Sequence, residues 1–131
     1  MFKNILTVVF VFLAYIVGAQ NIEFKAANFK DDKDGLKIAN EAIKSGNEFF
    51  ELGNEAFFAV KGPGHNYELA LIKYEIAQEF NPDNALLNFK IGVCHANSPY
   101  SNKSITYLNK AHKLDPECDE FMLYYYGVAL Q

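Results

Sequence analysis

Two cysteines and two histidines in the second half of the chain are the residues best suited to binding a metal. Cys94 and His95 are adjacent, and His112 and Cys118 follow at intervals of seventeen and six residues. These intervals differ from those of zinc fingers and ribbons. Adjacent helical residues also diverge by about 100° around the axis, so Cys94 and His95 do not readily share a metal. We therefore predict no metal site.

The sequence contains none of the short motifs that mark common catalytic centres. It has no glycine-rich loop followed by Lys-Ser/Thr, no G-x-S-x-G and no His-Glu-x-x-His. We expect His65 to be solvated in a Gly/Pro-rich loop and His95 to be packed in a helix, since no base or nucleophile motif accompanies it. The carboxylates of Glu68, Glu75 and Glu79 fit a solvated helix face. We predict no enzymatic activity, no cofactor and no small-molecule substrate.

The charged residues argue against nucleic acid as a partner. Acidic residues outnumber basic ones by 16 to 12, and all the basic residues are lysines. Arginine is the side chain most suited to bidentate phosphate and base contacts, and an acidic chain binds polyanions poorly. We expect contact with membranes to be indirect only.

The first nineteen residues have the pattern of a secretory signal peptide. Lys3 is their only charged residue, an apolar run extends from Ile5 to Val17, and Val17-Gly18-Ala19 fits a small-x-small cleavage site. A membrane anchor is the alternative, but thirteen apolar residues are fewer than the roughly twenty that span a bilayer. We predict an exported protein, periplasmic or outer-membrane-associated, whose mature chain begins at Gln20.

Residues 20–34 are predicted to form a polar, extended lead-in. Asp34 is suited to cap a helix over 35–45, where Leu36, Ala39 and Ile43 recur at helical spacing. Ser45-Gly46-Asn47 then predicts a break or kink, because glycine weakens helix interiors and asparagine favours helix starts.

A repeat of 34 residues organises the rest of the chain. Pro82 and Pro116 are 34 residues apart, and each follows a triplet at the same three offsets. The triplets lie on one helical face, and each proline ends its helix. We predict antiparallel helices at 47–60, 67–80, 85–97, 102–114 and 119–130. The two triplets are Ala70, Tyr74 and Ala77, and Ser104, Leu108 and Ala111.

Glycines inside two of these helices predict close helix contacts. Gly53 and Gly92 lie in apolar-periodic segments, where glycine costs about 1 kcal/mol relative to alanine. A missing Cβ repays that cost where a neighbouring helix approaches closely. We therefore expect both glycines to be buried, together with Tyr74 and Leu108.

The order of glycine, alanine or serine, aromatic residue or leucine, alanine and proline over residues 46–131 resembles the tetratricopeptide repeat (TPR). The resemblance implies an all-α fold of antiparallel helix hairpins stacked as a short TPR solenoid over residues 35–131. It would comprise a leading helix, two full repeats and the start of a third near Asp119. The chain departs from the pattern at the extra residues Lys61–His65 and at Ser104, where alanine is usual. The helix at 119–130 predicts either a longer protein or a cap with an exposed apolar face.

A narrower resemblance concerns the segment from Tyr67 to Cys94, YELALIKYEIAQEFNPDNALLNFKIGVC, with the signal peptide and the acidic lead-in. It is similar to the N-terminus of OmpA-like cell-envelope proteins of Bacteroidota, in which TPRs precede a β-propeller and a peptidoglycan-binding domain. The resemblance implies an exported scaffold whose partners are envelope proteins, within a longer polypeptide. A free periplasmic chaperone and an enzyme-associated regulator are the alternatives. No residue of this chain can be assigned to the peptidoglycan site.

The TPR pattern also implies an apolar, aromatic groove formed by the first helix of each repeat. Such a groove lacks the lysines that bind a terminal carboxylate, so recognition of chaperone tails is not expected. The alternative is that these side chains fill the core against the helix at 35–45. The groove residues implied are Phe50, Asn54, Phe57, Phe58, Phe89, Val93 and Ala96.

The two cysteines are predicted to remain free thiols. In the repeat register, Cys94 and Cys118 differ in height by about 12 Å. A disulfide needs Cα atoms within about 7 Å. We expect Cys94 to pack as a small hydrophobic residue.

Overall fold

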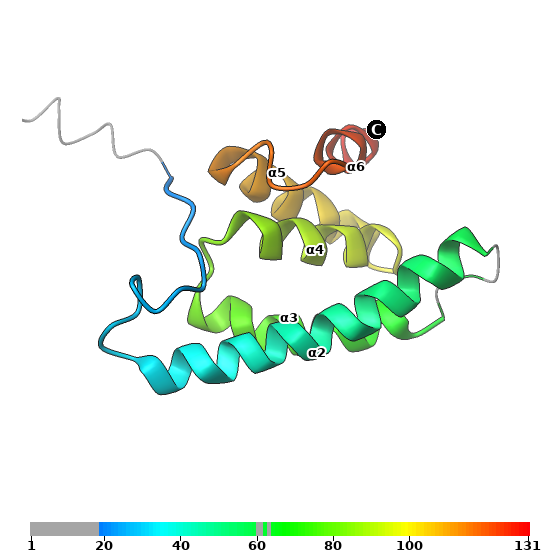
Figure 1. Cartoon of the computed structure of the whole chain (residues 1–131). Helices are drawn as coiled ribbons and strands as arrows, with labels where there is room; N and C mark the ends of the chain where they lie inside the picture. Colours follow the sequence, from blue (N-terminus) through cyan, green and yellow to red (C-terminus); the bar gives the residue numbers. More distant parts are fainter. Residues whose placement is uncertain (1–18, 60–61, 63) are drawn as a thin grey trace, which may run out of the picture.

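The computed structural model describes residues 19–59, 62 and 64–131, and the regular structure within them is entirely helical, as predicted. The predicted signal peptide falls almost wholly on residues 1–18, outside the described residues. Five α-helices and one short 3-10 helix follow one another along the chain (Figure 1). They are α2 (Lys33–Phe58), α3 (Asn66–Phe80), α4 (Ala85–Ala96), η1 (Ser101–Lys103), α5 (Ser104–Leu114) and α6 (Met122–Ala129).

Asparagine and aspartate side chains set the starts of two helices. The Asp32 side chain caps α2 by accepting a hydrogen bond from the Gly35 amide (2.8 Å). The prediction that Asp34 is the cap was wrong: it lies in the first turn of α2, where its carboxylate favours the positive end of the helix dipole. Asn84 caps α4 in the same way, accepting from the Leu87 amide (2.9 Å).

α2 is one continuous helix of 26 residues, so the predicted break at Ser45-Gly46-Asn47 was wrong. Gly46 is buried, and a Cβ there would lie 2.5 Å from the ring of Tyr74. One turn pair further along, a Cβ at Gly53 would lie 2.8 Å from the ring of Tyr67. Both glycines make room for tyrosine rings of α3, which runs antiparallel to α2. The glycine therefore serves packing here and does not interrupt the helix.

The second close contact joins α4 and α5. Gly92 is buried as predicted, and a Cβ on it would lie 2.6 Å from Leu108 Cγ. α3 also packs on α4, and α5 packs on α6, so the helices lie beside one another in chain order, with α2 and α3 at the bottom of Figure 1 and α6 at the top. The predicted burial of Tyr74, Ala77, Leu108 and Ala111 is confirmed.

A buried asparagine holds the turn between α3 and α4. Asn88 Nδ2 donates to the carbonyl oxygens of Pro82 (2.9 Å) and Asn84 (2.7 Å), and its Oδ1 accepts from Gln78 (3.2 Å). Because each polar atom of this side chain is satisfied, Asn88 is accommodated within the core at 0% exposure.

The last helix is shorter than predicted and buries little of its apolar surface. α6 begins at Met122 instead of near residue 119, and Met122 is its one fully buried side chain. The remaining large apolar side chains around it are exposed: Phe121, Leu123, Tyr124, Val128 and Leu130.

Substitution of the helix glycines tests these contacts. We expect Gly92→Ala to lower the free energy of unfolding by about 1–3 kcal/mol, because the new methyl group overlaps Leu108. Gly127→Ala is the matched control, since no atom lies within 4 Å of a Cβ there. We expect the control to be neutral or to gain up to about 1 kcal/mol from helix propensity. Urea unfolding of both variants is the measurement, and equal midpoints would contradict the contact.

Candidate protein-binding cleft

A cleft of about 450 Å³ lies between the lead-in, α2, α4 and the turn after α5. We call it the central cleft. Its lining combines four asparagines with a few apolar and charged side chains, and it differs in this from the apolar groove that the sequence predicts. The lining residues are Asn21, Glu23, Phe24, Lys25, Asn40, Ile43, Asn47, Tyr74, Asn84, Leu86, Leu87, Lys90, Asp115 and Cys118.

Asn47 organises the polar side of the central cleft. Its Oδ1 accepts hydrogen bonds from Tyr74 Oη (2.8 Å) and from Lys90 Nζ (2.8 Å). Seven residues further along α2, Asn54 Oδ1 accepts from Tyr67 Oη (2.8 Å). Residues seven apart lie on nearly the same helix face, so these amides form a stripe along α2. The amide nitrogen of each remains a donor for main-chain carbonyl groups.

Lys90 is the positive charge of the central cleft. Its burial lowers the pKa of the ammonium group, while the carboxylates of Glu51 and Asp119 act in the opposite direction. The ammonium also lies 5.5 Å from the centre of the Phe50 ring, within the range of a cation–π contact. The sequence-based description of a groove without lysine was therefore wrong for this cleft.

The predicted groove residues lie elsewhere. Phe50, Phe89 and Val93 are buried in the core, where their apolar side chains are removed from water, and so the core alternative holds for these three. Asn54 and Ala96 are half-buried, whereas Phe57 and Phe58 are exposed by 47% and 76% at the end of α2. None of the seven lines the central cleft.

Neither cysteine is prepared for nucleophilic chemistry. Both are free thiols. Burial is the main cause that raises the pKa of Cys118 to about 11, with Asp115 and Asp119 adding to it, so the thiol stays protonated at neutral pH. Cys94 is fully buried, and burial raises its pKa further. Cys94 thus packs as a small hydrophobic residue, as predicted.

The histidines are accounted for by local contacts. His65 is exposed and its Nδ1 lies 2.8 Å from Glu68 Oε2. His95 is buried against the ring of Tyr107, with centroids 5.4 Å apart. Burial lowers the pKa of His95, and the nearby charge of Lys103 acts in the same direction. Among the described residues, no three His, Cys, Asp or Glu side chains converge as metal ligands.

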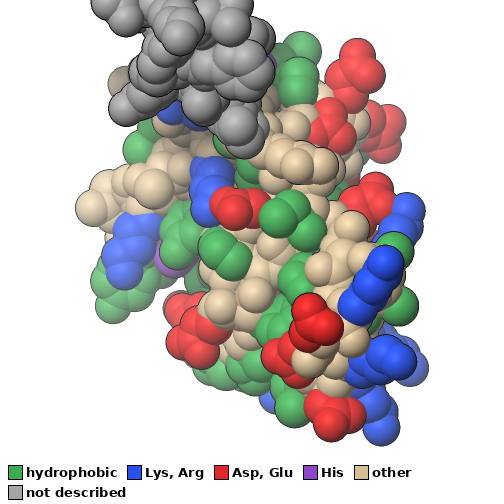
Figure 2. All heavy atoms as spheres, turned by 90° about the vertical axis from the view of Figure 1, so that its left-hand side faces the viewer, with side chains coloured by type: hydrophobic (Ala, Val, Ile, Leu, Met, Phe, Trp, Pro, Cys, Tyr) green, Lys and Arg blue, Asp and Glu red, His purple; other side chains and the backbone are tan. Residues whose placement is uncertain are grey.

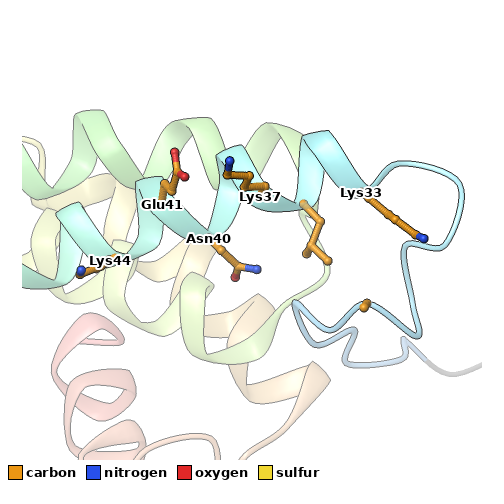
Figure 3. Close-up of a pocket in the computed structure, with 7 residues that line it drawn as sticks. Lys33, Lys37, Asn40, Glu41 and Lys44 are labelled. Carbon is orange, nitrogen blue, oxygen red and sulfur yellow. The ribbon is translucent and has the colours of Figure 1, made fainter.

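A second, more open hollow of about 520 Å³ follows the start of α2. Three lysines line it, but the labelled side chains point in different directions around the helix and do not converge on one ligand (Figure 3). The end of the molecule that carries the lead-in shows lysine and acidic side chains intermixed (Figure 2). Neither surface forms a uniform positive field of the kind that binds polyanions.

The central cleft is therefore suited to hold main-chain groups by hydrogen bonds. The sequence interpretation missed Asn47, Lys90 and the contribution of the lead-in. One available signal was the spacing of Asn40, Asn47 and Asn54 by seven residues, since asparagine is a poor residue for helix interiors.

Compared with known protein families, curated proteins and solved structures, the chain matches none of them. No helix among the described residues has both the length and the apolar character needed to cross a membrane.

Alkylation tests the two thiols. In native protein without reductant, we expect Cys118 to label slowly and Cys94 to label only on unfolding, because burial protects the latter. Mass spectrometry of the unreduced, unfolded chain should then find two labels per molecule. A monomer that labels only after reduction would mean that the two cysteines form a disulfide.

Proposed function

We propose that this chain is an exported protein–protein interaction module of the TPR type, which acts as a scaffold in a cell-envelope assembly. The observation that carries the proposal is the apolar surface at the ends of α2 and α6. Phe58, Leu123 and Tyr124 are exposed by 76%, 68% and 65%. Contiguous exposed apolar side chains are typical of surfaces that bind other proteins.

The helix contacts support the TPR-type arrangement. Each of the two repeats pairs a glycine in one helix with a large side chain of the next: Gly53 with Tyr67, and Gly92 with Leu108. Each second helix then ends directly before an Asn-Pro or Asp-Pro pair. The support for export is the pattern of the first nineteen residues.

A free chaperone would use the same apolar surface differently. It would bind many unfolded clients through side chains such as Phe57 and Phe58. A scaffold would bind one or a few folded partners in fixed proportion. The number and identity of the bound proteins therefore separate the two functions.

Site-specific photo-crosslinking in cells tests this proposal. We expect a photoreactive phenylalanine at position 123 to crosslink one or a few envelope proteins, because Leu123 is exposed in the apolar surface. The same residue at position 75, exposed on α3, is the matched control and should give no product. A broad distribution of unrelated products would favour the chaperone, and the absence of any product at position 123 would contradict both functions.

A further inference from the structure

The turn between α3 and α4 holds an extended piece of main chain. The Ile22 amide donates to the Asp83 carbonyl oxygen (2.8 Å). The Ile22 carbonyl oxygen accepts from Asn81 Nδ2 (2.8 Å) and Asn84 Nδ2 (3.0 Å). Because the donors and acceptors on the Ile22 side are main-chain groups, this turn recognises the course of an extended segment.

Neighbouring side chains complete the contact. Asn21 Oδ1 accepts from the Ala85 amide (2.9 Å) and so satisfies one of the unpaired donors at the start of α4. The Phe24 ring packs on the ring of Phe80, with centroids 6.5 Å apart. We call residues Asn21–Phe24 the strap.

The repeat shows that the turn does not need these amide donors for its own conformation. At the position 34 residues after Asn81, Asp115 Oδ1 accepts from the Glu117 amide (3.0 Å), just as Asn81 Oδ1 accepts from the Asp83 amide (3.2 Å). Cys118 stands at the position equivalent to Asn84. The second turn thus forms without either amide. The paired amides of the first turn are therefore explained by the main chain that they hold.

The strap also forms part of the wall of the central cleft. Asn21 and Phe24 line the cleft together with Asn47 and Lys90. Ile22 and Phe24 are only half-buried, and the strap lies outside every helix. Segments with few buried contacts open at lower free energy than the helices that carry them. A partner that approaches the cleft therefore meets a segment that can be displaced.

We propose that the α3–α4 turn is an exchangeable docking site for an extended peptide segment, and that the strap is its intramolecular occupant. The chemistry of the strap defines the ligand: an asparagine, then an apolar residue bonded through its main chain, then an aromatic residue two positions later. A binding partner that presents such a segment displaces the strap. This regulatory role rests on the proposed function, whereas the exchange itself can be measured without a partner.

The test uses the mature chain, residues 20–131, and a fluorescent peptide of residues 20–29 followed by anisotropy. The strap competes with the peptide, so the apparent affinity falls with the fraction of free sites. We expect the variant N21A/F24A, which weakens the strap, to bind the peptide at least about tenfold more tightly than wild type. Equal or absent binding in this variant, with an unchanged helical circular dichroism signal, would overturn the proposal.

A second substitution locates the site. Asn81→Asp keeps the acceptor for the Asp83 amide but replaces the donor to the Ile22 carbonyl by an oxygen. Added to N21A/F24A, it should remove at least about tenfold of the gained affinity, since an acceptor would face an acceptor. Asn102→Asp, exposed on η1, is the matched control and should leave the affinity unchanged. Unchanged affinity with Asn81→Asp would place the peptide elsewhere and overturn the proposal.

Amide exchange gives a reading on the wild-type fold. Unlabelled peptide should accelerate hydrogen exchange of the Ile22 amide in ¹⁵N-labelled protein, and unchanged exchange at saturating peptide would overturn displacement of the strap. Crosslinking without any envelope partner would contradict the proposed function and leave these peptide results intact. Failure of the peptide experiments would leave the crosslinking result intact.

Discussion

The close approach of α2 and α3 depends on tyrosine rings that pack against glycine. Gly46-Asn47 and Gly53-Asn54 are seven residues apart on α2 and receive Tyr74 and Tyr67 of α3. In each case the ring covers the glycine, and its hydroxyl group donates to the adjacent asparagine. A buried tyrosine needs such a partner for its hydroxyl group. The same residues thus hold the helices together and place amide groups along one face of α2.

The helical fold followed from the sequence because its main signals are local and repeated. The proline spacing and the Ala70, Tyr74 and Ala77 triplet predicted both the helix ends and the buried face. The continuity of α2 did not follow, because local propensities at Gly46 and Asn47 favour a helix break. The ring of Tyr74, on another helix, overrides them, and no local rule contains that contact.

The candidate site was less predictable, since it depends on contacts between distant segments. The hydrogen bonds that place the strap join Asn21 and Ile22 to residues 59 to 64 positions away in the sequence. Polar composition alone indicated an extended lead-in and gave no docking position. Similarly, a repeat register assigns positions to a helix face but does not decide burial, which is why Phe50 and Phe89 are core residues.

The central claim is that glycine–tyrosine packing keeps α2 continuous and aligned with α3. Nuclear Overhauser effects on the isotope-labelled mature chain test this claim directly. The account predicts cross-peaks from the Gly46 Hα protons to the Tyr74 ring and from the Gly53 Hα protons to the Tyr67 ring, with uninterrupted helical amide contacts through Ser45. Absence of both ring contacts, together with a loss of sequential helical contacts at residues 45–47, would contradict it.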